Sequence, residues 1–182
     1  MKTEIEARLL NVDEKLFLKK LNENNARFVG DWLQIRNCYD FHPAKENSWI
    51  RLRKEGNKTT LTIKEISTDK IDGTKENEIE VSDFDETNEI LNKLGYFARS
   101  IQENRRIRYI LDDVEIDIDF WPKIPTYVEF EAPSEEHIKN VCEKLGVSFD
   151  ELVTYGVSEI YRCHGYDIKT LPKTIYLEED RK

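Results

Sequence analysis

Pairs of like-charged residues, separated by one apolar residue, recur along this 182-residue sequence. The acidic pairs are Glu4/Glu6, Glu78/Glu80 and Glu129/Glu131, and an acidic run occupies positions 115, 117 and 119. The basic pairs are Arg51/Arg53 and Arg106/Arg108. Because alternate residues of a β-strand share one face, each pair would project from one side of a strand. Carboxylate pairs suit a hard divalent cation and arginine pairs suit phosphate oxygens, so the spacing indicates a site for both.

A solvated sheet face is the alternative interpretation, because antiparallel sheets often pack one face on the core and leave the other in water. Such a face usually mixes Thr, Ser, Gln and Lys, whereas here arginines and carboxylates occur in pairs, with the signs segregated by strand. Like charges on one strand repel each other, and a bound ligand would offset that repulsion. If the sheet closes into a barrel, the charged face can point inward.

The elements that must position these residues are strands and helices in a regular order. Alternation predicts eight strands, at residues 3–9, 32–41, 48–54, 59–65, 75–81, 104–111, 114–120 and 126–132. Apolar residues at helical spacing, with capping residues, predict helices at 14–26, between Asp83 and Gly95, and at 135–145, and residues 149–165 are expected to be helical in their first part. We therefore predict an α+β fold: a closed eight-stranded antiparallel β-barrel with a charged interior and helices packed outside.

Composition limits the partners and the cellular compartment. Charged residues make up 36% of the chain, above the average of about 25%, and the net charge is −9. Such an anion is a poor non-specific binder of nucleic acid or of acidic membranes, so neither partner is expected. The cysteines, Cys38, Cys142 and Cys163, have no metal-ligand spacing and are expected to be free thiols. No apolar run has the length of a membrane span, and we expect a cytoplasmic protein.

Six segments, in this order, resemble the signature strands of the CYTH superfamily, the triphosphate tunnel metalloenzymes. Residues 4–8, Glu-Ile-Glu-Ala-Arg, resemble the N-terminal Glu-x-Glu-x-Lys hallmark of that family, with Arg8 in place of the lysine. The others are residues 49–53, 62–64, 78–80, 106–108 and 127–131, and residues 117–125 look most like the bacterial branch that resembles class IV adenylyl cyclases. The resemblance covers residues 1–165, which we take as one domain, followed by a polar tail at 166–182.

The resemblance implies a role for each charged strand. It implies Mg²⁺ or Mn²⁺ held by Glu4, Glu6 and Glu131, with Glu129 as a further ligand, and it implies a triphosphate clamp built from Arg8, Arg51, Arg53, Lys64, Arg106 and Arg108. Arg8, Lys64 and Asp119 are the expected catalytic residues. Glu78, Glu80, Asp117 and Asp119 could hold a second metal, orient the arginines or activate water, and the sequence does not separate these roles.

Three functions share this set of residues. The first is hydrolysis of inorganic triphosphate or a similar compact triphosphate, with ATP and thiamine triphosphate as further candidate substrates. The second is a class IV-type adenylyl cyclase, in which the ribose 3′-hydroxyl attacks the α-phosphorus of ATP and releases pyrophosphate. The third is a non-catalytic module that binds polyphosphate or nucleotides. Either a monomer or a homodimer is compatible with the sequence.

Overall fold

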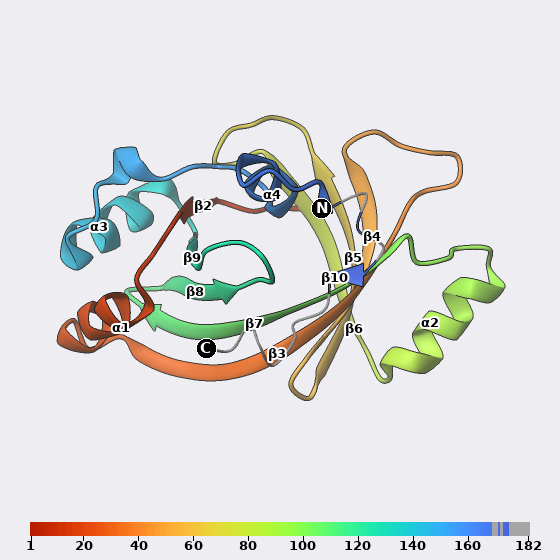
Figure 1. Ribbon diagram of the computed structural model, residues 1–182, viewed down its shortest axis with the longest axis horizontal. Coiled ribbons are helices and arrows are strands. Elements are labelled where there is room, and N and C mark those ends of the chain that lie inside the picture. The colour runs from red at the N-terminus through yellow and green to blue at the C-terminus, as the bar shows by residue number, and fades with distance from the viewer. Residues whose placement is uncertain (169–170, 172, 175–182) are drawn as a thin grey trace.

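A strongly curled sheet forms the centre of the computed structural model, which describes residues 1–168, 171 and 173–174 (Figure 1). The strands in these residues are β1 (Lys2–Thr3), β2 (Glu6–Leu9), β3 (Arg27–Tyr39), β4 (Ser48–Glu55), β5 (Lys58–Ile66), β6 (Thr74–Val81), β7 (Ser100–Leu111), β8 (Val114–Phe120), β9 (Tyr127–Glu131) and β10 (Lys173–Thr174). Their order is β1-β6-β5-β4-β3-β7-β8-β9-β2, with β10 added beside β7. Every pair along this order is antiparallel, and only β10 pairs in parallel. By their residue ranges, β2–β9 correspond to the eight predicted strands.

The N-terminal segment joins the two edges of the sheet. The predicted strand at residues 3–9 is divided: β1 pairs with β6, and β2 pairs with β9 at the opposite edge. Between them, the amide of Glu4 donates to Thr74 O (2.9 Å), and the amide of Ala132 donates to Ile5 O (3.1 Å). The segment therefore hydrogen-bonds to both edges in turn, which completes the predicted barrel.

Helices α1 (Glu14–Glu23), α2 (Phe84–Lys93) and α3 (Glu135–Leu145) lie outside the curled sheet, whereas residues of α4 (Val157–Cys163) line the space inside it. A 3₁₀ turn, η1 (Phe149–Glu151), precedes α4. Figure 1 shows α1 and α3 at one end of the molecule and α2 at the other. Two expected caps are present, because the carboxylate of Asp13 accepts from Leu16 N (2.9 Å) and that of Asp83 accepts from Glu86 N (2.8 Å). The third expected cap, Ser134 before α3, makes no side-chain capping hydrogen bond.

The hydrophobic core lies between the helices and the outer face of the sheet. Ile116 and Phe130 are fully buried there, in one cluster with Leu21 of α1 and with Ile138 of α3. A smaller cluster joins Leu91 of α2 to the apolar residues of β3 and β4. The charged residues that alternate with these positions face the inside of the curl. This arrangement confirms the prediction that the polar face is internal and the apolar face is covered by helices.

Several predicted boundaries differ from the structure. The helix predicted at 14–26 ends at Glu23, and the first part of residues 149–165 forms only the 3₁₀ turn η1, with the α-helix α4 in the later part. The long strands β3 and β7 begin several residues before the predicted positions 32 and 104. They pair from Arg27↔Ile110 to Cys38↔Ser100, with a bulge between Phe28 and Gly30. The first residues of β3 are largely exposed and show no apolar alternation, so only the cross-strand hydrogen bonds define them as a strand.

Part of the predicted tail, residues 166–182, packs against the barrel. Ile168 is buried in a cluster with Trp121, Tyr127 and Ile160, and β10 pairs with β7. These contacts extend the folded unit beyond the predicted boundary at residue 165. Residues 169–170, 172 and 175–182 of the predicted tail lie outside the described residues.

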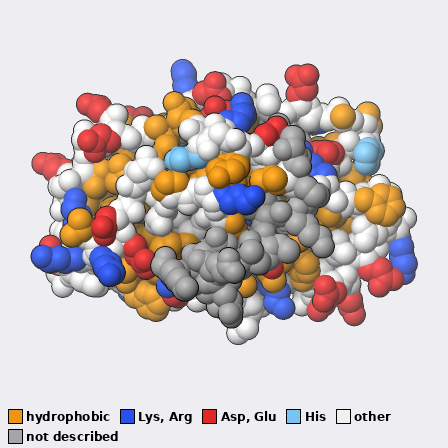
Figure 2. All heavy atoms as spheres, viewed as in Figure 1, with side chains coloured by type: hydrophobic (Ala, Val, Ile, Leu, Met, Phe, Trp, Pro, Cys, Tyr) orange, Lys and Arg blue, Asp and Glu red, His pale blue; other side chains and the backbone are white. Residues whose placement is uncertain are grey.

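Two expectations from composition concern the cysteines and membrane association. All three cysteines are free thiols, as predicted, with Cys38 and Cys142 buried and Cys163 exposed. No helix in the described ranges is long and apolar enough to cross a lipid bilayer. Figure 2 shows acidic, basic and hydrophobic side chains interspersed over the viewed face.

Candidate active site

A cavity of about 1050 Å³ lies inside the curled sheet. Eleven of the fourteen residues predicted for the site line it. The N-terminal segment, β4 and β5 contribute Glu4, Glu6, Arg8, Arg51, Arg53 and Lys64, whereas β6, β7 and β9 contribute Glu78, Arg106, Arg108, Glu129 and Glu131. The alternation within each strand, combined with ring closure, brings these dispersed residues together.

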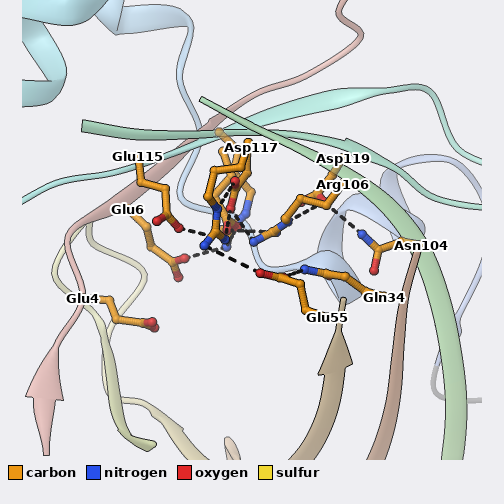
Figure 3. Close-up of polar contacts among 12 residues, drawn as sticks. Glu4, Glu6, Gln34, Glu55, Asn104, Arg106, Glu115, Asp117 and Asp119 are labelled. Atoms are coloured by element: carbon orange, nitrogen blue, oxygen red, sulfur yellow. Dashed lines mark hydrogen bonds and ion pairs between the residues drawn. The ribbon is translucent and has the colours of Figure 1, made fainter. Parts of the chain in front are cut away.

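The other three predicted site residues, Asp117, Asp119 and Glu80, are not among the residues that line the cavity. Asp117 and Asp119 are 2% and 0% exposed and lie beside the arginines of β7. Arg106 Nε donates to Asp119 Oδ1 (2.8 Å), and Arg108 Nε donates to Asp117 Oδ1 (2.7 Å). Of the roles left open by the sequence, this geometry matches orientation of the arginines (Figure 3).

The position of Glu80 follows from the register of β5 and β6. Lys64 of β5 pairs with Glu76, whereas Glu80 pairs with Thr60 near the other end of the strand and is exposed. Glu76 lines the cavity instead. Glu76 belongs to the same alternating series as Glu78 and Glu80, and that parity was the signal that could have identified it.

Arg106 is the most heavily compensated arginine of the site. Its Nη1 lies 2.5 Å from Asp117 Oδ2, and its Nη2 lies 2.5 Å from Asp119 Oδ2 and 3.2 Å from Glu129 Oε1. Burial alone would lower the pKa of Arg106, but these carboxylates outweigh burial and hold that pKa well above its ordinary value. Arg106 is therefore a permanently charged and rigidly oriented group on the cavity wall.

Arg8, at the position where the resemblance implies a lysine, is similarly engaged. Its Nη2 lies 2.8 Å from Glu6 Oε2 and 2.5 Å from Glu129 Oε2, and its Nη1 donates to the carbonyl oxygen of Tyr155 (2.9 Å). Burial opposes the charged form, but Glu129 and Glu6 raise the pKa of Arg8. Arg8 therefore connects β2, β9 and the segment before α4 as a fixed cation.

Four carboxylates, Glu4, Glu76, Glu129 and Glu131, line the cavity around the closure of the ring, and we call them the carboxylate group. Burial raises the pKa of Glu4, and Glu76 and Glu129 raise it further, against the attraction of Lys64 at 2.8 Å. Burial also raises the pKa of Glu131, again with repulsion from Glu4 and Glu129. Glu76 Oε2 is buried without a hydrogen-bond partner. Glu129 differs from Glu4 and Glu131, because Arg8 and Arg106 outweigh its burial and hold its pKa below the ordinary value. Repulsion among these carboxylates is therefore greatest at Glu4 and Glu131.

The carboxylate group fits a hard divalent cation in its chemistry. Its members present oxygen ligands, Glu4 and Glu131 repel each other, and the buried Oε2 of Glu76 makes no hydrogen bond, although Lys64 lies 3.4 Å from it. Within the described part of the chain, no three such side chains already surround a single point. Part of the reason is that Lys64 draws Glu4 aside while Arg8 and Arg106 hold Glu129.

A second group of opposite charge lies on β3 and β4. Arg36, Arg51 and Arg53 line the cavity, and we call them the cationic wall. Burial lowers the pKa of Arg53 to about 9, and repulsion from Arg51 contributes. In the ring of strands, β3 has β4, β5 and β6 on one side and β7, β8 and β9 on the other. The N-terminal segment completes the ring, so β3 lies opposite it in the strand order, whereas Arg51 of β4 lies 3.9 Å from Glu76 of the carboxylate group.

Buried polar atoms without a hydrogen-bond partner are confined to residues that line the cavity, among the described residues. They are Arg8 Nε, Arg36 Nε, Arg51 Nε, Thr60 Oγ1, Glu76 Oε2, Trp121 Nε1 and Tyr127 Oη. Buried polar groups in native proteins are nearly always hydrogen-bonded. Their concentration here indicates that the cavity is built to receive a polar ligand.

Glu115 and Arg36 are functional candidates that were not among the predicted site residues. Burial and the charge of Asp117 raise the pKa of Glu115 to about 7, despite Arg108 nearby. Glu115 had a visible signal, because it continues the series of Asp117 and Asp119. Arg36 had little signal, because its strand neighbours of the same parity are the uncharged residues Gln34 and Cys38.

A family model described as the CYTH domain matches residues 2–160 of the chain. No curated protein matches the chain in sequence. Among solved structures, the PH1012 protein of Pyrococcus horikoshii is 22% identical with a TM-score of 0.74, covering 86% of this chain and 98% of its own. A candidate adenylate cyclase of Vibrio parahaemolyticus is 14% identical, with a TM-score of 0.73 and coverage of 87% and 97%. A Hippeastrum protein described as an adenylyl cyclase candidate with a dominant triphosphatase activity is 16% identical, with a TM-score of 0.61 and coverage of 86% and 92%.

Proposed function

The chain belongs to the CYTH domain family, and we propose that it is a metal-dependent triphosphatase that hydrolyses inorganic triphosphate, or a similarly compact triphosphate, inside the cavity. The observation that carries this proposal is the composition of one enclosed cavity, which is lined by arginines of β3, β4 and β7 and by carboxylates of the N-terminal segment, β6 and β9. A triphosphate bound to a divalent cation is anionic along its chain and cationic at the metal. Its charge distribution is therefore complementary to that of the cavity.

The arginines would bind the phosphate oxygens. Guanidinium groups present planar pairs of N–H donors that match such oxygens, and Arg51, Arg53, Arg106 and Arg108 reach the cavity from two strands. Arg106 and Arg108 are already held in place by Asp117 and Asp119, so they lose little freedom when substrate binds. Phosphoryl transfer depends mainly on positioning and charge neutralisation, which this arrangement supplies.

Glu4 and Glu131, with Glu76 and Glu129 beside them, would hold a divalent cation. A bound Mg²⁺ or Mn²⁺ would neutralise phosphate charge and favour attack by water. The residues of the chain itself would orient the substrate from both sides. Lys64, which contacts Glu4 (2.8 Å) and Glu76 (3.4 Å), would balance the charge of this group and reach the phosphate from β5.

The direct test measures products from three substrates. Orthophosphate and pyrophosphate release is followed from inorganic triphosphate, ATP and thiamine triphosphate, each with Mg²⁺, with Mn²⁺ and with a chelator. The variant is Glu131→Gln, and the matched control is Glu80→Gln, which changes an exposed glutamate outside the cavity. We expect orthophosphate release from inorganic triphosphate that requires metal and is lost in Glu131→Gln but not in the control.

The other outcomes would replace the proposal. Release of pyrophosphate together with cyclic AMP, from ATP alone, would assign the protein as an adenylyl cyclase. Binding of triphosphate without turnover of any substrate would assign a binding module. Hydrolysis that persists in the presence of chelator would contradict the metal requirement.

A further inference from the structure

Arg36 is a buried arginine whose charge has no carboxylate partner in the hydrogen bonds of the described residues. It lies on β3, is 7% exposed and lines the cavity. Its Nη2 donates to the side-chain oxygens of Gln34 and Asn104, and its guanidinium carbon lies 4.7 Å from the centre of the Trp121 ring. Two amides and an aromatic face therefore fix the orientation of the guanidinium without neutralising it.

The contrast with the other interior arginines is one of charge. Arg106 contacts Asp117, Asp119 and Glu129, whereas the hydrogen-bond partners of Arg36 are neutral. Burial and repulsion from Arg51 and Arg106 lower the pKa of Arg36 to about 10. A buried, uncompensated charge costs stability unless a partner of opposite sign arrives.

The free hydrogen-bonding atoms near Arg36 are donors. Arg36 Nε and Trp121 Nε1 are both buried without hydrogen-bond partners, and both residues line the cavity. Neither group can accept a hydrogen bond. A ligand at this point must therefore present acceptors only, and an anion satisfies the charge as well. Phosphate oxygens have this chemistry.

The surroundings hold these donors in fixed positions. Trp121 packs in a buried cluster with Tyr127, Ile160 and Ile168, which come from β9, α4 and the residues after it. Asn104 is itself held, because its Nδ2 donates to Asp119 Oδ1 (2.9 Å). Preorganised donors in a partly dry site bind an anion more strongly than mobile surface residues do.

We propose that Arg36, supported by the indole N–H of Trp121, is a substrate-binding residue that binds a phosphate group of the triphosphate on the β3 side of the cavity. This inference rests on the proposed function for the identity of the anion. It adds to the paired arginines of β4 and β7 a third strand, β3, that contacts the substrate. Gln34 and Asn104 act as positioning residues for Arg36.

The test measures anion binding in the presence of a chelator, so that hydrolysis does not enter. Calorimetry gives the Kd of wild type and of Arg36→Gln for inorganic triphosphate, pyrophosphate and orthophosphate, and thermal unfolding is followed with and without triphosphate. The matched control is Arg105→Gln. Arg105 also stacks on an aromatic ring, Phe120 at 4.9 Å, but pairs with Asp31 and does not line the cavity.

We expect Arg36→Gln to weaken triphosphate binding about tenfold or more, because a charge-assisted contact is lost. The thermal midpoint without ligand should stay the same or rise, and the shift caused by triphosphate should shrink. Arg105→Gln should bind triphosphate as wild type does. A purely structural role would instead lower the midpoint without ligand and leave the triphosphate Kd of the folded variant unchanged, which would overturn the proposal.

Arg36→Lys decides the case if Arg36→Gln does not fold. A folded lysine variant that binds triphosphate several-fold more weakly than wild type and than Arg105→Lys supports a guanidinium contact. A lysine variant that binds triphosphate as tightly as wild type contradicts it. Wild type that binds triphosphate with chelator but hydrolyses it with neither Mg²⁺ nor Mn²⁺ overturns the proposed function and leaves the role of Arg36 intact. Wild type that binds none of the three anions, either with chelator or with metal, overturns both proposals.

Discussion

The ammonium nitrogen of Lys64 lies 2.8 Å from a carboxylate oxygen of Glu4, and this contact joins β5 to the segment that closes the ring of strands. Both side chains are largely buried, at 12% and 5% exposed. We expect Lys64→Met to lower the free energy of unfolding at pH 7 by about 3 kcal/mol, because it leaves a buried carboxylate unpaired. Urea unfolding measures this loss.

The double variant Glu4→Gln/Lys64→Met separates the ion pair from the packing of the two side chains. It removes both charges, so it should recover most of the stability lost in Lys64→Met. The deficit of the single variant should also shrink toward acidic pH, where Glu4 becomes protonated and neutral. If the single and double variants are equally unstable at all pH values, the charge of Lys64 does not stabilise the carboxylate of Glu4.

Asp119 provides a test of whether this carboxylate orients Arg106 or binds a metal ion. It contacts Arg106 and Asn104 and does not line the cavity. We expect Asp119→Asn to reduce kcat/KM for triphosphate by about ten- to a hundredfold, because an outer residue that fixes a functional group is lost. The Kd for Mn²⁺, measured by titration, should remain that of wild type. A parallel weakening of Mn²⁺ binding would identify Asp119 as a metal ligand instead.

The interior face of the barrel could be predicted because alternation is a local property. In β7, Arg106 and Arg108 alternate with Ile107 and Tyr109, and in the structure the first pair faces the cavity while the second packs in the core. One strand with this pattern is ambiguous. The same pattern recurs in several strands, with basic residues on some and acidic residues on others, and this repetition indicated an enclosed, ligand-binding interior.

The depth of each residue along the cavity could not be predicted in the same way. Glu76, Glu78 and Glu80 share one parity, and only the register of β5 against β6 determines that Glu76 meets Lys64 while Glu80 is exposed. Arg36 was missed for a related reason. Its neutral partner Asn104 lies 68 positions away, and its stacking partner Trp121 comes from another strand end, so the site exists only in the folded chain.

Glu115 predicts a pH dependence of stability. Burial and Asp117 raise its pKa to about 7, so the folded state binds a proton more tightly than the unfolded state does. Stability from this residue is therefore present below its ordinary pKa and falls as the pH rises toward 7. Glu115→Gln removes this dependence. The thermal midpoint of Glu115→Gln minus that of wild type should therefore increase from pH 5 to pH 8. For Glu80→Gln this difference should not change with pH. If it does not change with pH for Glu115→Gln either, Glu115 is not the source of the pH dependence.

Tyr127 offers a hydroxyl that has no hydrogen-bond partner in the described residues although it is buried and lines the cavity. Burial, with the charges of Asp119 and Glu129, holds its pKa well above the ordinary value, so the hydroxyl stays protonated and can donate to an anion. We expect Tyr127→Phe to leave the protein as stable as wild type, or up to about 1 kcal/mol more stable, because an unsatisfied group is removed. Triphosphate binding should weaken about fivefold.

The matched control for Tyr127→Phe is Tyr39→Phe. Tyr39 is also fully buried, but its hydroxyl donates to Asn88 Oδ1 (2.7 Å) and it does not line the cavity. Its substitution should cost about 1 kcal/mol of stability, because Asn88 loses a donor, and should leave triphosphate binding unchanged. Calorimetry and urea unfolding on both variants therefore give opposite patterns if the free hydroxyl of Tyr127 serves the ligand. Matching patterns would mean that its hydroxyl has only a structural role.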